Sequence, residues 1–160
     1  MRSTIGPTGL KLLATLAAGG EIVDYDEAGQ LVIEHKGERK VSAGYRANAE
    51  LIELGMVAGV PPEDGGNGYC FPVTITDTGR ALLPWLQKGW RFSFMGKGRA
   101  ALIEGPGTPS TIVPLVDADE WQLPPGATPW DRAMRDSRLR QLAGARIAAK
   151  IAAIADEPES

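Results

Sequence analysis

Two groups of side chains in this 160-residue chain have residue types that could do chemistry. Cys70 and His35 are the only cysteine and the only histidine, so the chain offers neither an internal disulfide nor a metal-ligand cluster of credible spacing. Asp117, Asp119 and Glu120 form an acidic cluster that could hold a cation or do acid–base work, but no nucleophile or further ligand motif accompanies it. We therefore expect a solvated acidic loop, a small buried strand residue at Cys70, no cofactor, no metal and no enzymatic activity.

A glycine-rich basic stretch, Gly-Lys-Gly-Arg at 96–99, is a third place to look for phosphate chemistry. It lacks the upstream glycine and the hydroxyl after the lysine that a P-loop requires. The runs 90–94 and 100–104 flank it with β-type patterns, which predicts a hairpin with a turn at 96–99. The aromatic residues near this hairpin are Trp85, Trp90, Phe92 and Phe94. They could stack on nucleic acid bases, but aromatics at alternating positions more often fill a core, and we favour that interpretation.

Composition limits the class of protein. With 43% apolar residues the chain can bury the core of one domain, or of one domain with a small appendage. No apolar run approaches the roughly 20 residues of a membrane span, and the N-terminus has no basic region followed by an apolar core. We therefore expect a cytoplasmic protein that does not bind membranes. The net charge of −3 argues against gross electrostatic attraction to nucleic acid.

The charge is unevenly distributed along the chain. Up to residue 84 there are seven Lys or Arg against eleven Asp or Glu. Between 85 and 104 four cations stand against one glutamate. From 129 to 155 two aspartates accompany six cations, namely Arg132, Arg135, Arg138, Arg140, Arg146 and Lys150. Most of the basic surface is therefore expected outside the N-terminal half.

Helical spacing, alternation and turn residues divide the chain into elements. In the N-terminal half we expect a helix over 8–18 that ends at Gly19 and Gly20, followed by a hairpin of 21–25 with 30–35. A second helix is expected to be capped by Ser42 and to end at Gly55. Strands over 56–60 and 69–76 around a Gly-rich tip at 61–68, and a helix capped by Thr76 or Asp77, complete this half. Residues 105–129 are rich in Pro, Gly and Thr and predict an extended connector with at most one short strand at 112–116, anchored by Trp121.

The last part of the chain predicts a long amphipathic helix. Thr128, Pro129 and Asp131 supply a hydroxyl cap, a first-position proline and a carboxylate near the helix start. The helix is expected to continue to Ala155, and its apolar stripe consists of Leu139, Ala143, Ile147, Ile151 and Ile154. Such a stripe packs either on its own chain or on the same helix of a second copy, in preference to a membrane surface. Residues 156–160 predict a disordered acidic tail.

Two segments resemble a known family. Leu51-Ile52-Glu53-Leu54-Gly55-Met56-Val57 looks like the end of a recognition helix entering a wing, and residues 75–83 are similar to the strand-to-helix return of bacterial winged helix-turn-helix regulators of the MarR type. The resemblance covers the N-terminal half only. It implies an α+β fold in which a winged-helix domain carries a β-hairpin insertion and a C-terminal extension ending in the long amphipathic helix. The expected divisions are 1–84, 85–128, 129–155 and the tail 156–160.

The resemblance also implies a function. In that family the helix before the wing enters the major groove of duplex DNA. Carried over, Tyr45, Arg46 and Asn48 would lie near bases, and Lys36, Arg39 and Lys40 are further candidate DNA contacts. This predicts a non-catalytic transcriptional regulator that binds double-stranded DNA and dimerises through its C-terminal helix.

Acidic residues favour an alternative. Glu63 and Asp64 stand at the expected wing tip, and Glu50 and Glu53 stand on the expected reading helix, where phosphates would repel them. The alternative is a protein-binding adaptor or inhibitor that uses a winged-helix scaffold to dock on a nucleic-acid-handling partner. The two hypotheses differ in where the cations converge. DNA is favoured if Lys36, Arg39, Lys40 and Arg46 meet the arginines of the terminal helix on one face. Docking on a protein is favoured if acidic residues instead surround an exposed apolar patch.

Overall fold

The first part of the chain is built on a five-stranded antiparallel sheet with helices against it. The structure, a computed structural model, describes residues 4–60 and 70–156. In chain order the elements of this part are α1 Pro7–Ala17, β1 Glu21–Tyr25, β2 Leu31–His35, β3 Glu38–Ser42, α2 Tyr45–Glu53, β4 Val57–Val60, β5 Cys70–Ile75 and α3 Asp77–Gln87. The strand order is β3-β2-β1-β5-β4, which makes β3 and β4 the two edges of the sheet.

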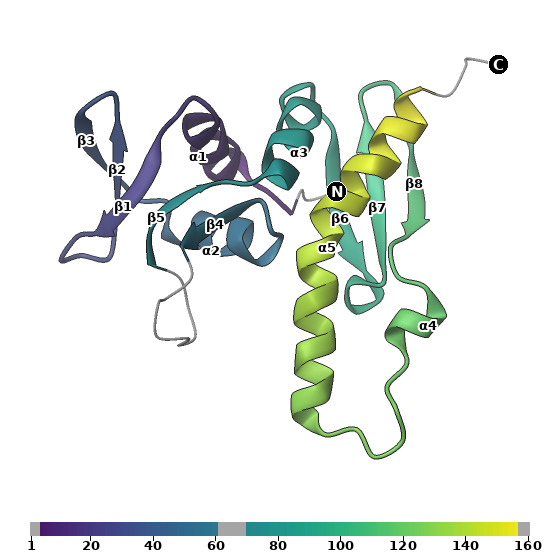
Figure 1. The fold of residues 1–160 in the computed structure, drawn as a ribbon. Coiled ribbons are helices and arrows are strands. Elements are labelled where there is room, and N and C mark those ends of the chain that lie inside the picture. Colours follow the sequence, from purple (N-terminus) through teal and green to yellow (C-terminus); the bar gives the residue numbers. More distant parts are fainter. Residues whose placement is uncertain (1–3, 61–69, 157–160) are drawn as a thin grey trace.

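The second part combines a small antiparallel sheet with the long terminal helix. Its elements are β6 Arg91–Met95, the 3-10 turn η1 Gly96–Gly98, β7 Ala100–Gly105, β8 Thr108–Pro114, α4 Ala118–Trp121 and α5 Pro129–Ala155. The strands lie in the order β6-β7-β8, and α5 packs on α3 and α2. The β2–β3 hairpin stands at one end of the molecule, while the first half of α5 extends beyond the sheets beside α4 at the other end (Figure 1).

One cluster of buried apolar side chains joins the two parts. Leu13 of α1, Leu82 of α3 and Ile147 of α5 are each 0% exposed, and so is Phe92 of the small sheet. Most of the predicted apolar stripe of α5 is therefore buried within its own chain. The buried members of the stripe are Leu139, Ala143, Ile147 and Ile151. Packing on the same chain was one of the two fates expected for this helix. A dimer through the terminal helix would have to use another of its faces.

The helices α3 and α5 begin at the capping residues that the sequence predicts. The hydroxyl of Thr76 accepts a hydrogen bond from the Gly79 amide at the start of α3. At the start of α5 the Thr128 hydroxyl accepts from the Asp131 amide, and the Asp131 carboxylate accepts from the Thr128 amide in return. Such reciprocal bonds satisfy amides that have no partner inside the helix. The α+β class, both predicted hairpins and the long terminal helix are confirmed.

Two expectations from the sequence need correction, and one strand was missed. Ser42 does not cap α2, because it is the last residue of β3 and the N-cap position belongs to Gly44, which has no side chain to bond with. The strand β3 itself was not expected. Residues 105–129 are not simply an extended connector, since Thr108–Pro114 forms β8 on the small sheet and Ala118–Trp121 forms α4.

Some expectations stay untested. The Gly-rich tip at 61–68, with Glu63 and Asp64, and the tail residues 157–160 lie outside the described residues. The division of the chain at 84 and 128 also stays a prediction. Among the described residues no helix is both long and apolar enough to cross a membrane.

Candidate binding groove

A groove of about 790 Å³ lies between α1 and the β2–β3 hairpin. From α1 it is lined by Lys11, Leu12 and Thr15, and from the hairpin by Ile33, Lys36 and Lys40 among others. Leu12 and Ile33 are core residues and give the groove an apolar floor. Its size falls within the range of about 300–1,000 Å³ that is usual for ligand-binding clefts.

The register of the hairpin decides which side chains face the groove. Ile33 pairs with Lys40 and His35 pairs with Glu38. Directly opposed residues of an antiparallel pair share a face of the sheet, and Ile33 faces the core. Lys40 and Glu38 therefore lie on the α1 side of the hairpin. Lys36 and Gly37, with φ of 54° and 80°, form the two-residue left-handed turn that brings Lys36 to the same groove.

Lys11, Lys36 and Lys40 all line the groove. Within the described residues none of their three ammonium groups takes part in a hydrogen bond, ion pair or cation–π contact. Glu38 is the one acidic side chain among the described residues of the lining. The groove therefore combines an apolar floor with a positive rim. Such a surface suits a ligand that carries negative charge.

The structure separates the cations that were predicted to bind DNA. Lys36 and Lys40 lie in the groove, but Arg39 faces the opposite side of the hairpin, where its Nε lies 3.0 Å from the Glu34 carboxylate. Lys11 was not among the predicted site residues. It stands on the polar face of α1, far from the hairpin in sequence. The signal that could have found it is that Lys11 is the one cation in the sequence of α1.

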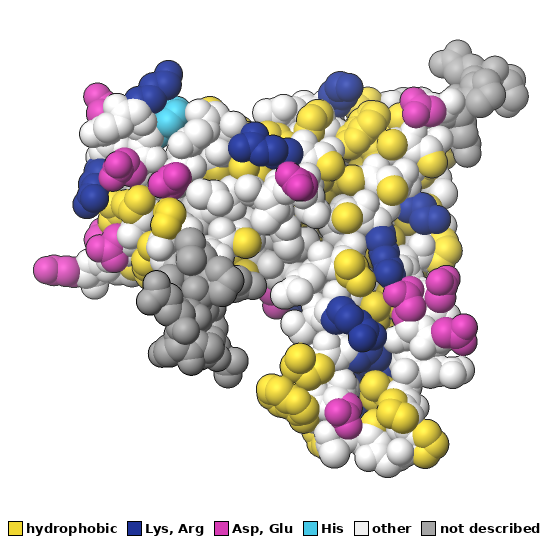
Figure 2. All heavy atoms as spheres, in the orientation of Figure 1, with side chains coloured by type: hydrophobic (Ala, Val, Ile, Leu, Met, Phe, Trp, Pro, Cys, Tyr) yellow, Lys and Arg dark blue, Asp and Glu magenta, His cyan; other side chains and the backbone are white. Residues whose placement is uncertain are grey.

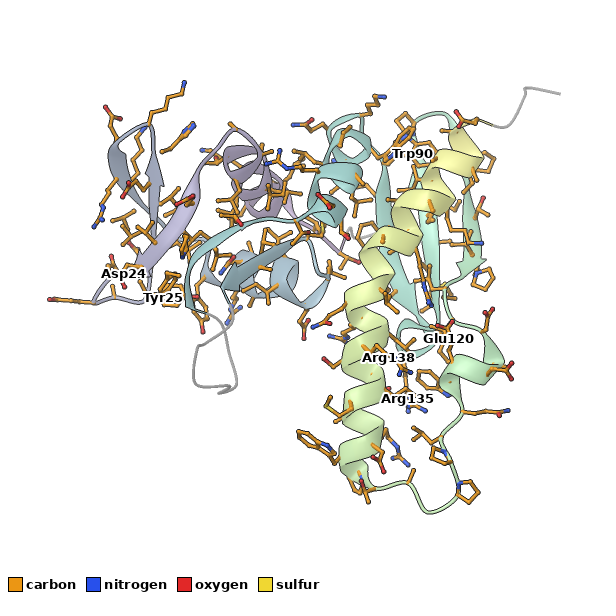
Figure 3. The ribbon with its side chains drawn as sticks, viewed as in Figure 1. Asp24, Tyr25, Trp90, Glu120, Arg135 and Arg138 are labelled. Atoms are coloured by element: carbon orange, nitrogen blue, oxygen red, sulfur yellow. The ribbon has the colours of Figure 1, made fainter. Side chains whose placement is uncertain are left out.

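The candidates on α2 have different environments. Arg46 is exposed and shares the outward face of α2 with Glu50 and Glu53. Tyr45 is 55% exposed, and its ring packs edge-on against Tyr25, 5.6 Å between centroids. Figure 3 places Tyr25 at the end of β1 that is remote from α5.

Asn48, which was expected to lie near bases, has to be removed from the candidate interface. Its side chain is only 1% exposed, and its Oδ1 has no hydrogen-bond partner among the described residues. It is on the same inward face of α2 as Leu51, three residues further on, which is fully buried. The helical period therefore turns Asn48 away from any ligand that would approach the exposed face of α2.

Several arginines of α5 are held by neighbours in the same chain. Arg140 reaches Glu53 of α2 at 2.9 Å. Arg135 donates to the Trp121 carbonyl, binds Asp136 and stacks on the Trp121 ring at 3.8 Å from its centroid. Figure 3 shows Arg135 and Arg138 on α5 near the α4 segment. On the face drawn in Figure 2, several Lys and Arg side chains gather along α5, and the others appear as separate spots.

The predicted anchor, Trp121, and the acidic cluster have structural roles. The Arg99 guanidinium stacks on the Trp121 ring at 4.9 Å, so that ring contacts two arginines.

Asp117 caps α4, and Glu120 forms the returning bond of that capping box. Glu120 also binds both terminal nitrogens of Arg146, at 3.0 and 2.6 Å. The cluster is therefore not a simple solvated loop, because Glu120 ties α4 to α5.

The ion pair between Glu120 and Arg146 shifts the pKa of both partners. The hydrogen bonds from Arg146, followed by the bond from the Asp117 amide, hold the pKa of the Glu120 carboxyl below its ordinary value. The same pairing raises the pKa of Arg146. Arg146 also donates to the Leu115 carbonyl at 2.7 Å, so it links α5 to the chain that follows β8.

The other side chains whose types could do chemistry do not lie together. His35 Nε2 lies 3.0 Å from the Ala18 carbonyl and joins the end of β2 to the end of α1. Cys70 begins β5, as a strand position was expected, but its side chain lies outside what the structure describes. Among the described residues no three His, Cys, Asp or Glu side chains are grouped as a metal site would require.

Comparisons of this chain with protein-family models, with curated proteins and with solved structures found no match.

Proposed function

We propose that this chain is a binding module that docks on another protein, and that the groove between α1 and the β2–β3 hairpin is its docking site. The observation that carries the proposal is the convergence of Lys11, Lys36 and Lys40, whose ammonium groups have no partners among the described residues, on one groove with an apolar floor. Mixed apolar and charged surfaces of this kind are typical of protein interfaces, where charge gives specificity and rapid association.

The distribution of the other cations favours a protein partner over duplex DNA. The outward face of α2 carries Arg46 together with Glu50 and Glu53, and Glu53 pairs with Arg140 of α5, so these four side chains give no net positive charge. Arg135, Arg140 and Arg146 are occupied by groups of their own chain. The β2–β3 hairpin, which carries Lys36 and Lys40, lies at the opposite end of the molecule from α5 (Figure 1). Affinity for duplex DNA depends on cations that reach many phosphates at once.

The test is fluorescence anisotropy with two labelled probes, a short poly-glutamate peptide and a duplex DNA. We expect the peptide to bind, and the double change Lys11→Gln with Lys40→Gln to weaken its binding about tenfold. The matched control is Arg132→Gln with Lys150→Gln, which removes the same charge from exposed positions on α5. Equal losses in the two double variants, or tighter binding of DNA than of peptide at the same salt concentration, would contradict the proposal.

A second candidate is the winged-helix regulator of transcription. Its support is the order α2, β4, β5, α3, in which an exposed helix precedes an antiparallel strand pair, and the exposure of Tyr45 and Arg46 at the start of α2. In a winged helix this helix would read the major groove. The β1–β2–β3 strands occupy the place where a winged helix usually has its second helix.

The DNA hypothesis predicts that Arg46→Ala weakens duplex binding several-fold at low salt, because a phosphate or base contact is lost. A gel-shift titration measures it. Arg80→Ala, at an exposed position of α3, is the control for the loss of one charge. If both variants bind DNA as the wild type does, α2 is not a recognition helix.

A further inference from the structure

We propose that the occupant of the groove is an extended, acidic segment of the partner protein, which adds to β3 as a further antiparallel or parallel strand. This inference rests on the proposed docking function and specifies its mode. The observation behind it is that the lysine-lined groove runs beside an edge strand. β3 is the last strand of the five-stranded sheet, and residues 38–41 of it are exposed.

The backbone of β3 has hydrogen-bonding groups directed away from β2. Pairs in an antiparallel ladder alternate between hydrogen-bonded and non-hydrogen-bonded, and the pair that closes a two-residue turn is hydrogen-bonded. The closing pair here is His35 with Glu38, so Lys40 and Ser42 also bond to β2. The N–H and C=O groups of Arg39 and Val41 therefore point to the open edge of the sheet.

An added peptide strand would satisfy those groups. Each outward N–H needs an acceptor and each outward C=O needs a donor, an alternation that another peptide backbone supplies. Phosphate oxygens are acceptors only, so a nucleic acid backbone cannot match the carbonyls. The five residues of β3 offer an edge of about 17 Å at roughly 3.4 Å per residue.

Side-chain charge defines the sequence of the added strand. Successive side chains of a strand point to opposite faces, so every second residue of the added segment would face α1. There it meets Lys11 and Lys40, which lie on the two walls of the groove, and Lys36 at the turn. Carboxylates at alternate positions would pair with these lysines. The opposite face of the segment would lie beside Val41, which is 55% exposed, and Val32.

The test uses a labelled peptide of alternating Glu and Val and the variant Val41→Pro. Proline removes the outward N–H of residue 41 without removing a bond to β2, a substitution that edge strands tolerate. Val41→Ala is the matched control, because it shortens the side chain and keeps the N–H. We expect Val41→Pro to weaken peptide binding about tenfold and Val41→Ala to weaken it less than about threefold.

A second measurement does not depend on the fold of the proline variant. In the wild type, amide hydrogen exchange at Arg39 and Val41 should slow when the peptide is bound, because both amides become ladder donors. Exchange at Lys40, whose amide already bonds to β2, should change less. A peptide in which alternate residues are N-methylated lacks the matching donors and should not bind.

The outcomes separate the two levels of the proposal. If the lysine variants weaken binding while the Arg39 and Val41 amides exchange as before, the groove binds acidic protein segments without strand addition, and this inference is wrong. If neither acidic peptide binds at all, the docking function itself is wrong. Competition by duplex DNA, with slowed exchange absent at β3, would assign the groove to nucleic acid and overturn both.

Discussion

Arg146 binds Glu120 and the Leu115 carbonyl and so holds α5 against both α4 and the end of the small sheet. Because pairing lowers the pKa of Glu120 in the folded state, its contribution to stability is complete above the ordinary carboxyl pKa of 4.5 and is lost as pH falls through the lower folded-state value. The ion pair is therefore a source of acid sensitivity.

We expect Glu120→Gln to lower the thermal midpoint at pH 7 and to reduce the fall in that midpoint between pH 7 and acid. Glutamine cannot hold the charge that Arg146 attracts, so the variant loses the contribution that titrates. Thermal unfolding followed by circular dichroism over a pH series measures it. Asp119→Asn is the control, since Asp119 is an exposed neighbour in α4. Parallel pH profiles for Glu120→Gln and the wild type would refute this role.

Asn48 is a buried polar residue whose Oδ1 has no hydrogen-bond partner among the described residues. Replacing such a group by an apolar side chain of similar size removes a desolvation cost. We expect Asn48→Leu to raise the free energy of unfolding by about 1 kcal/mol, measured by urea denaturation. The same variant should bind every ligand as the wild type does. If the variant lost ligand binding without losing stability, Asn48 would belong to the binding interface after all.

Single residues of the groove were only partly predictable from the sequence. Lys36 and Lys40 stand out as a basic run beside an expected turn, so a charge argument finds them. Lys11 joins them only through the packing of α1 against the hairpin, which no local pattern encodes. Arg39 and Asn48 do not join the groove, because strand alternation and the period of α2 turn their side chains away from it.

At the scale of elements, α5 crosses the end of α2 with almost no space between backbones. A Cβ at Gly144 would lie 2.7 Å from the Leu54 carbonyl oxygen and 2.8 Å from Thr78 Cγ2. On the facing side, Gly55 has a φ of +72°, and a Cβ there would lie 2.8 Å from the Gln141 carbonyl oxygen. The two glycines allow α5 to sit on the turn between α2 and β4.

We expect Gly144→Ala to destabilise the chain by about 1–3 kcal/mol, although alanine favours helices, because overpacking forces the two elements apart. Gly6→Ala is the control, since a Cβ at Gly6 would meet nothing within 4 Å. Denaturant unfolding of both variants measures the difference. A stabilised Gly144→Ala variant would mean that α5 does not approach α2 this closely.

The sequence missed the short helix α4 and the strand β3, and it allowed only a short strand at 112–116 where β8 covers Thr108–Pro114. Both of these strands are edge strands. In β3 residues 38–41 are exposed, and in β8 Val113 is the buried residue, so neither strand has the alternation of apolar and polar residues that marks a half-buried strand. The strands β1, β2, β6 and β7 pack a face on the core and were predicted. Their register and neighbours depend on long-range contacts that the sequence does not reveal.

For the whole molecule, the fate of the apolar stripe decides how α5 can act. Ile147 and Ile151 are each 0% exposed within their own chain. The apolar side chains that α5 presents outward include Trp130 and Met134, 67% and 52% exposed, on the half that extends beyond the sheets (Figure 1). Leu142, in the middle of α5, is also exposed, at 40%. A dimer through the terminal helix would therefore have to form around these three side chains.

Three exposed apolar side chains provide only a small apolar surface for an interface, since stable interfaces bury about 1,200–2,000 Å² in total. We therefore expect light scattering to give the mass of a monomer for the wild type and for Trp130→Ser with Met134→Ser. The double change Ile147→Asp with Ile151→Asp should instead abolish cooperative unfolding, because two charges enter the core. A dimeric wild type that the serine variant converts to monomers would show that α5 forms an interface through its extended half.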